Sequence, residues 1–285
     1  MKFDVVVGNP PYAQNQGRTS GGAGGKTQWD KFLEINLRAC RDGGHLAMIH
    51  PNGWRLNQRQ STAWAQITGQ DLQHLEMFDA HDGESVFGAS TNFDWYVLQR
   101  QPYGGNTRVV FQDGVRADID IAQTAHLRLV NNHRAFAILS ALTLKPCSNN
   151  LCSSQRLDGK HTDNPTDTHT LKAIGGFRAG QPRFIYGEPE HAPAVHLGKP
   201  KLVFSCIGST DYYYDKRGEF GVSNADVMAF TGDNSLHFQR FERFLLSDAW
   251  ATLSAAIRVS NQKLNRPLLR TLDLSASALQ RAMTL

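Results

Sequence analysis

The segment that decides the fold reads F-D-V-V-V-G-N-P-P-Y and occupies residues 3–12. Its three consecutive valines, residues 5–7, show no polar alternation, which is typical of a strand buried on both faces within a parallel sheet. Pro10 and Pro11 cannot donate hydrogen bonds to a neighbouring strand, so they end the strand in a turn. We therefore expect Asn9 at the carboxyl end of this strand, where open α/β sheets place their ligand sites.

The residues after this turn continue as alternating helices and strands. We expect helices over residues 28–41 and 58–68, and strands over residues 45–50 and 74–79. Gly43 and Gly44 are expected to end the first helix, and the first strand, helix and second strand form a parallel βαβ unit with a right-handed crossover. Residues 92–99 and 107–112 flank a turn-rich stretch and predict an antiparallel hairpin at the edge of the sheet.

The character of the sequence changes near residue 125. We expect an α/β domain over residues 1–125, a linker region over residues 126–170 and an α+β domain over residues 171–285. In the last of these, the patterns predict strands over residues 201–206 and 212–214 and helices over residues 236–246 and 250–259.

Composition restricts the class of protein. The formal net charge of +4 and the isoelectric point near 8.9 suit a polyanionic partner such as DNA, although many proteins of this charge bind none. Cys147 and Cys152 are the only close pair among four cysteines, and no histidine cluster completes a zinc site, so we expect no bound metal. No apolar stretch approaches the roughly 20 residues of a membrane helix, so we expect a cytoplasmic protein.

The residues at the end of the first strand suit one kind of chemistry. An amino group conjugated to a planar ring is a poor nucleophile and needs acceptors that draw its nitrogen towards tetrahedral geometry. Asn9 offers a side-chain carbonyl, and Pro10 offers a backbone carbonyl held rigid by Pro11. Tyr12 offers a flat face for stacking, which contributes roughly 1–3 kcal/mol per base. The alternative is an ordinary strand-ending turn, in which Asn and Pro are common.

Residues 3–12 resemble the catalytic motif of amino-group methyltransferases, in particular the gamma-order DNA adenine-N6 enzymes of restriction–modification systems. Residues 43–54 (G-G-H-L-A-M-I-H-P-N-G-W) resemble the next strand of that family. Residues 83–87 (G-E-S-V-F) resemble its later motif, whose phenylalanine stacks on the flipped adenine. The resemblance assigns catalysis to Asn9, Pro10, Pro11 and Tyr12, and substrate contact to Tyr12 and Phe87. Ordinary core packing is the alternative for Phe87.

The resemblance also implies a fold, a cofactor and a partner. It implies a Rossmann-like methyltransferase sheet, S-adenosyl-L-methionine as methyl donor, and double-stranded DNA whose target base is rotated out of the helix. Residues 199–204, 214–218 and 261–269 resemble target recognition domains, so residues 171–285 are expected to read DNA. Eight basic residues are candidates for phosphate contacts, with a solvated surface charge as the alternative for each: Arg178, Arg183, Lys199, Lys201, Lys216, Arg217, Lys263 and Arg266.

The sequence departs from the family in one respect. In the gamma-order enzymes, the glycine-rich strand that binds the cofactor precedes the Asn-Pro-Pro-Tyr motif. In this sequence the motif begins at residue 9. Residues 173–180 do not replace that strand, so no cofactor-binding residue is assigned. The loop at residues 20–27 approximates a phosphate-binding loop, but Ser20 stands in place of its first glycine and no strand leads into it. We expect the cofactor-binding half on a second polypeptide, or lost from a truncated or decayed reading frame. Residues 3–7 would then form an apolar edge strand.

Two other functions stay open. The chain could be a non-catalytic DNA-binding or assembly subunit of a restriction–modification system, because it keeps the fold without an assigned cofactor site. RNA and protein amino-group methyltransferases also use Asn-Pro-Pro-Tyr, but they generally stop soon after the catalytic sheet. The long C-terminal part therefore favours a DNA-reading module.

Overall fold

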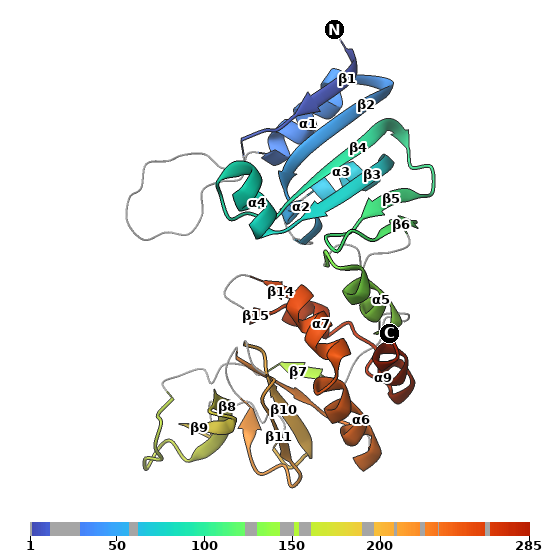
Figure 1. Ribbon diagram of the computed structural model, residues 1–285. Coiled ribbons are helices and arrows are strands. Elements are labelled where there is room, and N and C mark those ends of the chain that lie inside the picture. Colours follow the sequence, from blue (N-terminus) through green and yellow to red (C-terminus); the bar gives the residue numbers. More distant parts are fainter. Residues whose placement is uncertain are drawn as a thin grey trace. The chain divides into compact units, whose positions relative to one another are not determined.

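The structure is a computed structural model of the 285-residue chain (Figure 1). It describes residues 2–11, 29–56, 62–122, 130–142, 151–153, 161–189, 197–207, 210–222, 226–232, 234–259 and 263–285. The chain divides into two compact units, residues 1–136 and residues 137–285. In the described ranges, no helix combines the length and the apolar composition that crossing a bilayer requires.

The first unit is built on a six-stranded mixed sheet with the order β1-β2-β4-β3-β5-β6. Its strands are β1 (Phe3–Gly8), β2 (Cys40–Pro51), β3 (Gln70–Phe78), β4 (Phe93–Pro102), β5 (Thr107–Val110) and β6 (Arg116–Ile119). The pairs β1–β2 and β3–β5 are parallel, and the other three pairs are antiparallel. This confirms the expected α/β class with a mixed parallel and antiparallel sheet, in which the antiparallel pair at one edge is formed by β5 and β6.

The expected βαβ unit is present. Helix α1 (Trp29–Ala39) joins β1 to β2, and the two strands pair in parallel with Gly8 opposite Met48. The expectation that Gly43 and Gly44 end the helix is wrong, because β2 begins at Cys40 and both glycines lie inside it. A Cβ atom on Gly44 would lie 2.9 Å from the backbone oxygen of Asp4, so this glycine allows the close approach of β1 and β2.

The hairpin predicted from residues 92–99 and 107–112 is also wrong. Strand β3 lies between β4 and β5, so β4 is an inner strand that pairs antiparallel with β2 and with β3. Tyr96 and Leu98 of β4 are completely buried, as expected for a strand with neighbours on both sides. The turn residues after β4 indicate a chain reversal, but they do not say which strand the chain then joins.

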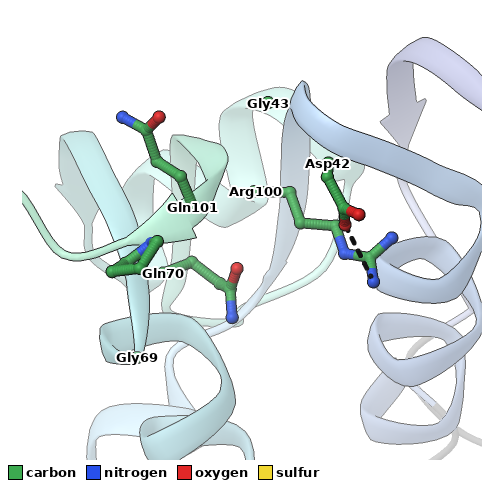
Figure 2. A pocket seen from close by; sticks show the side chains of 7 residues that line it. Asp42, Gly43, Gly69, Gln70, Arg100 and Gln101 are labelled. Carbon is green, nitrogen blue, oxygen red and sulfur yellow. Dashed lines mark ion pairs between the residues drawn. The ribbon is translucent and has the colours of Figure 1, made fainter.

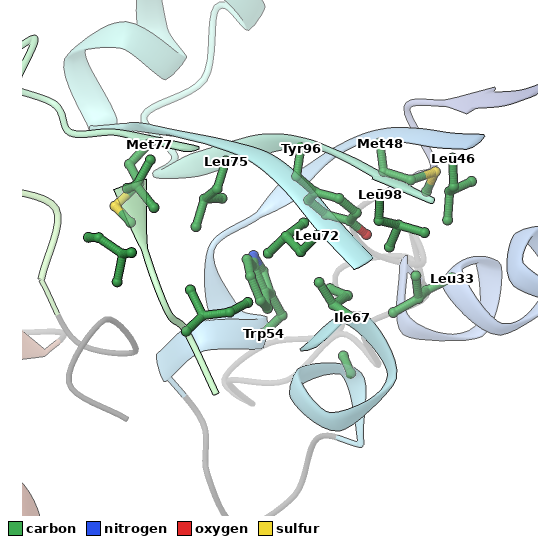
Figure 3. Packing of buried hydrophobic residues seen from close by; sticks show 14 of the residues in the cluster. Leu33, Leu46, Met48, Trp54, Ile67, Leu72, Leu75, Met77, Tyr96 and Leu98 are labelled. Atoms are coloured by element: carbon green, nitrogen blue, oxygen red, sulfur yellow. The ribbon is translucent and has the colours of Figure 1, made fainter. Parts of the chain in front are cut away.

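One face of this sheet carries the core. Helices α1, α2 (Gly53–Leu56) and α3 (Ala63–Thr68) contribute to the same apolar cluster as the inward side chains of the strands (Figure 3). The labelled members are Leu33, Leu46, Met48, Trp54, Ile67, Leu72, Leu75, Met77, Tyr96 and Leu98. Buried and half-buried residues alternate along β2, β3 and β4, so the opposite face is only partly covered.

Strand β1 is one of the two edge strands of the described sheet, with β6 at the other side, and its exposed side chains form the expected apolar edge. Phe3, Val5 and Val7 are 50%, 59% and 76% exposed, and Val6 packs against the core. The burial on both faces that the three valines indicated is therefore not present in this chain, because no described element covers the outer face of β1.

A buried ion pair joins β4 to helix α2, which follows β2. Asp94 and Arg55 both have fully buried side chains. Asp94 Oδ2 accepts hydrogen bonds from Arg55 Nε and Trp54 Nε1, each at 2.7 Å, and Asp94 Oδ1 accepts from Arg55 Nη2 at 2.8 Å. Arg55 Nη2 also donates to Asn131 Oδ1 at 2.8 Å. A buried carboxylate needs such donors, so this set of bonds (the Asp94 anchor) fixes the start of β4 beside the end of β2.

Helix α4 (Ala80–Phe87) follows β3 and has well-defined ends. Asp79 accepts hydrogen bonds from the amides of His81 and Asp82, and Asp82 accepts from the amide of Asp79, which completes a capping box. Gly88 ends the helix with a left-handed φ of 65°. Inside the helix, a Cβ atom on Gly83 would overlap the carbonyl oxygen of Thr91 and lie 3.0 Å from that of Ala89. Gly83 therefore allows α4 to pack against the loop that leads into β4.

The second unit contains two larger sheets and a group of helices. A four-stranded sheet has the order β11-β10-β13-β7, a three-stranded sheet has the order β12-β8-β9, and β14 pairs with β15. The strands are β7 (Leu151–Ser153), β8 (Leu171–Arg178), β9 (Gln181–Gly187), β10 (Lys201–Ser205), β11 (Tyr212–Asp215), β12 (Gly221–Val222), β13 (Val227–Phe230), β14 (Arg258–Val259) and β15 (Lys263–Leu264). The helices are α6 (Ser235–Leu245), α7 (Asp248–Ala256), α8 (Arg266–Leu269) and α9 (Ala276–Met283).

Several expectations for this unit are confirmed, namely the strands at β10 and β11 and the helices at α6 and α7. Helix α5 (His133–Leu142) spans the division between the units, and it lies with β7 inside residues 126–170, the range predicted as a linker.

A buried ion pair links two of the second-unit segments that carry the family resemblance. Lys201 Nζ lies 2.7 Å from Asp215 Oδ2, with both side chains almost completely buried. Burial raises the pKa of Asp215, but the hydrogen bonds from Lys201 and from the amides of Phe220 and Glu219 outweigh it, so the pKa lies below its ordinary value. The interpretation of Lys201 as a candidate phosphate contact is therefore wrong, because its ammonium group is used inside the unit.

We predict that Asp94→Asn destabilises the chain by about 3–5 kcal/mol, because it leaves the buried Arg55 without its counter-charge. Asp118→Asn is the matched control, since Asp118 pairs with Arg108 on the surface at 3.6 Å and such pairs contribute about 0–1 kcal/mol. Urea unfolding followed by circular dichroism measures both. Equal stabilities of the two variants would contradict the role given to the Asp94 anchor.

We predict that Gly83→Ala lowers the free energy of unfolding by about 1–3 kcal/mol, because the new methyl group overlaps backbone oxygens that cannot move independently. Gly53→Ala serves as the control, because the nearest atom to its added Cβ is 3.9 Å away. Thermal unfolding of both variants tests this. A Gly83→Ala protein as stable as Gly53→Ala would show that α4 does not pack closely on this loop.

Candidate functional site

The first predicted site residues lie where β1 ends. Asn9 and Pro11 are exposed and Pro10 is buried, while Tyr12 lies outside the described residues. Because Gly8 pairs with Met48 in the parallel register, Asn9 and Pro10 continue beside the carboxyl end of β2. The carboxyl ends of adjacent parallel strands are where an open α/β sheet binds its ligands.

At the carboxyl end of β2, aromatic side chains joined by stacking and hydrogen bonds support this part of the sheet. His50 is buried and stacks on Trp29, with 4.6 Å between ring centroids and 14° between planes. Its Nε2 lies 3.0 Å from the hydroxyl of Tyr96, and its Nδ1 lies 3.1 Å from the carbonyl oxygen of Pro51. Since a carbonyl can only accept, Nδ1 carries the proton and Nε2 accepts from Tyr96.

This histidine is held in its neutral form. Burial lowers the pKa of His50, against the raising effect of the hydrogen bond to Pro51 and of the Asp94 charge. Burial also raises the pKa of Tyr96 well above its ordinary value, and the nearby Asp94 acts in the same direction. The pair is therefore neutral and ordered at physiological pH, which makes it a support for the edge and a poor acid or base.

Phe87 lies at the same edge of the sheet. Its ring meets that of Phe93 edge-on at 4.9 Å between centroids, and Phe93 in turn stacks on Phe78 at 4.5 Å. Phe93 is opposite Pro51 of β2 and Phe78 of β3, so the whole aromatic group belongs to the end of the sheet where Asn9 lies. In the order β1-β2-β4, two strand spacings of about 4.8 Å each separate β1 from β4. Phe87 therefore packs on the aromatic side chains of β3 and β4, at the same end of the sheet as the motif.

Sequence reasoning missed the residues that hold this edge together. The Asp94 anchor and the stack of Trp54 on Trp64, at 5.5 Å between centroids, lie directly behind the end of β2. One signal was available, because an aspartate within the otherwise apolar strand at residues 93–98 must be paired if it is buried.

One group of potential metal ligands in the described part of the chain lies at this edge. Ligand atoms of Asp79, His81 and Asp82 lie within 4.8 Å of one another. The two carboxylates already accept the backbone hydrogen bonds of the α4 capping box. Capping accounts for their positions, so we assign no metal to them.

A shallow pocket of about 460 Å³ lies at the opposite edge of the same sheet (Figure 2). It is lined by Asp42, Gly43, Gly69, Gln70, Arg100, Gln101 and Pro102. Arg100 Nη2 pairs with Asp42 at 3.3 Å across it. None of the predicted site residues lines this pocket, and it lies at the amino ends of β2 and β3. The candidate site is therefore at the carboxyl ends of β1 and β2, where Asn9 and Pro10 lie.

Solved structures show a similar fold. The type IIL restriction-modification enzyme MmeI, solved in complex with DNA, matches with a TM-score of 0.50 and 9% identity, over 94% of this chain and 45% of that one. The type IIG restriction endonuclease BpuSI matches with a TM-score of 0.40 and 12% identity, over 99% of this chain and 49% of that one. At these identities the likeness concerns the fold alone, and only the first is close enough to support it.

Sequence comparison gives a more specific result for the first unit. A curated relative, the uncharacterized adenine-specific methylase of Mycoplasma pneumoniae, is 41% identical over 58 residues. The match covers 20% of this chain and 13% of that protein, so the chain spans only a small part of its relative. Residues 1–87, which contain β1, the end of β2 and helix α4, match the Eco57I restriction-modification methylase family. The resemblance to restriction–modification methylases that the sequence motifs implied is therefore confirmed, and residues 1–87 are the part of the chain that carries it.

Proposed function

We propose that this chain supplies the adenine-binding edge of a DNA methyltransferase that transfers a methyl group from S-adenosyl-L-methionine to N6 of an adenine. One observation carries the proposal: the Asn-Pro-Pro segment lies at the carboxyl end of a parallel strand, inside the part of the chain that matches a methylase family. Residues at this position can reach a ligand held at the edge of the sheet.

Asn9 and Pro10 act on the amino group. The side-chain oxygen of exposed Asn9 and the backbone oxygen of Pro10 each accept one hydrogen of the adenine amine. This draws the nitrogen lone pair out of conjugation with the ring and directs it towards the methyl donor. Pro11 fixes the backbone in the required geometry. After methyl transfer the amine is cationic and releases a proton to water, so no general base is needed.

Phe87 and Tyr12 are proposed to hold the base. A base inside a duplex cannot be reached, so the target adenine must be rotated out of the helix. Phe87 lies at the same end of the sheet as the motif, supported by Phe93 and Phe78, and offers an aromatic surface for the extruded ring. The second unit is proposed to read the surrounding DNA sequence, as the resemblance of its segments to target recognition domains implies.

S-adenosyl-L-methionine supplies an electrophilic methyl group when bound. The described residues at the carboxyl edge provide acceptors for an amine, but none is assigned to the cofactor. We propose that a further segment, from a longer form of this polypeptide or from a second one, binds the cofactor and pairs with β1. The exposed apolar side chains of Phe3, Val5 and Val7 support this, because parallel sheets normally have both faces covered.

A non-catalytic DNA-binding or assembly subunit is the second candidate, because no cofactor residue is assigned. The two functions differ in one outcome. A complex that binds DNA and never methylates it, whatever cofactor-binding segment is added, would favour the subunit. A methyltransferase acting on RNA or protein is less well supported, since the second unit would then have no substrate to read.

We predict that Asn9→Ala lowers methyl transfer at least 100-fold and changes DNA affinity less than twofold, because it removes one acceptor aimed at the reacting amine. The assay combines the chain with a methylase fragment of this family that ends before its own Asn-Pro-Pro-Tyr motif, and counts tritiated methyl groups on duplex DNA. Asn106→Ala, in the loop between β4 and β5 at the far end of the sheet, is the control and is expected to remain active. Activity of Asn9→Ala within a factor of two of wild type would reject the assignment.

We predict that the double substitution Val5→Lys and Val7→Lys weakens association with that fragment at least tenfold, because each buried valine contributes roughly 1.5–3 kcal/mol. The melting temperature of the isolated chain should stay nearly unchanged, since both side chains are exposed. Val115→Lys, also exposed, is the control. Sedimentation or surface plasmon resonance measures the affinity. Unchanged association of the double variant would show that the further segment does not pack on β1.

A further inference from the structure

We propose that the β8–β9 hairpin of the second unit is a DNA-reading ribbon that presents Arg178, Gln181 and Arg183 to base edges in the major groove. This inference rests on the proposed function, and it goes beyond it by naming the side chains that choose the sequence. A two-stranded ribbon fits the major groove, whose width is about 12 Å.

The register of the hairpin places the three side chains on one face. Arg178 is opposite Gln181, and Gly176 is opposite Arg183. Residues directly opposite each other in an antiparallel pair point to the same side of the sheet, and residues two apart along a strand do so as well. Arg178, Gln181 and Arg183 therefore share a face, and all three are exposed.

The turn of the hairpin is tight and well defined. Ala179 and Gly180 connect the strands with φ angles of 51° and 77°. Two central residues with positive φ are characteristic of a type I′ turn, whose twist matches that of the strands it joins. The loop is therefore short, and it holds Arg178 and Gln181 side by side at the tip.

The opposite face of the hairpin is anchored. Phe177 and Phe184 pack against the core cluster of the second unit. Lys172 Nζ also lies 4.0 Å from the centroid of the Phe184 ring. Near its tip the other face carries the exposed Arg178, Gln181 and Arg183, whereas Ile185 further along that face is buried. A ribbon held at its base in this way can keep the side chains at its tip in a constant position, which specific recognition requires.

There is open space beside Arg183. Among the described residues, no atom beyond the chain neighbours lies within 4 Å of a Cβ built on Gly176, which faces Arg183 across the hairpin. A hollow of about 190 Å³ opens there, lined by Gly175, Gly176, Phe177, Arg183, Ser205, Ile207 and Asp226. We propose that a base edge approaches Arg183 from the side of this hollow.

The side chains match the donors and acceptors of bases. An arginine donates two hydrogen bonds to O6 and N7 of guanine, and a glutamine bonds N6 and N7 of adenine. Arg183 pairs with exposed Asp163 at 3.2 Å, and a surface pair of this kind contributes at most about 1 kcal/mol. The guanidinium can therefore exchange that carboxylate for a base.

The test uses the full chain with Arg178→Ala, Gln181→Ala and Arg183→Ala, one at a time. Selection from a random duplex pool, followed by sequencing, gives the preferred sequence, and fluorescence anisotropy gives the affinity for it. Each variant should lose preference at its own position and bind the selected duplex about 5- to 150-fold more weakly, as one lost base contact predicts. Arg38→Ala, which removes an exposed arginine from α1, should bind like wild type.

A fourth variant, Gly176→Leu, adds bulk on the reading face without changing charge. It should weaken the selected complex to a similar degree while the melting temperature stays within about 2–4 °C of wild type, because the added Cβ has no described atom within 4 Å beyond its chain neighbours and the rest of the side chain can extend into the hollow. Wild-type preference in all four variants, with wild-type binding intact, would overturn the reading role of the hairpin and leave the DNA-binding function standing. Failure of the wild-type chain to bind any duplex would overturn both.

Discussion

A carboxylate taken out of water must find donors, and Asp94 finds them in Trp54 and Arg55. These residues belong to helix α2, which directly follows β2, so their bonds fix the carboxyl end of β2 against the start of β4. The parallel pairing of β1 with β2 then places Asn9 and Pro10 beside that fixed end. The position of the proposed acceptors thus depends on a charge pair that touches neither of them.

This arrangement explains why an edge strand can carry reactive groups. Strand β1 has one described neighbour and an exposed apolar face, so its own packing contributes little rigidity to Asn9. The order comes from β2, which has the neutral His50–Tyr96 pair and the Trp29 stack behind it. A segment that covers β1 would complete the sheet without having to build the amine-binding edge.

The local features of the fold could be predicted from the sequence, and the long-range ones could not. The strand that ends at Pro10, the helix after it and the helices of the second unit follow from spacing and turn residues within short windows. The position of β3 between β4 and β5 depends on contacts between distant segments. The turn residues that follow β4, beginning at Pro102, carry no information about those contacts. Lys201 looked like a surface cation for the same reason, since its partner Asp215 is in another strand. Asn9 and Pro10 were predicted from their carbonyl groups and from the family resemblance, and Phe87 from the resemblance alone, whereas Trp54, Arg55 and Asp94 required the structure.

We propose that an extruded adenine meets the carboxyl ends of the first-unit strands. Photocrosslinking can locate that base, using duplex DNA with a photoreactive adenine analogue at the target position, in the complex that contains the cofactor-binding segment. Mass spectrometry of the crosslinked peptides should place the adduct within residues 9–12 or at Phe87. Adducts at Arg100 and Gln101, which line the pocket at the opposite edge of the sheet, with none at residues 9–12 or 87, would contradict the account.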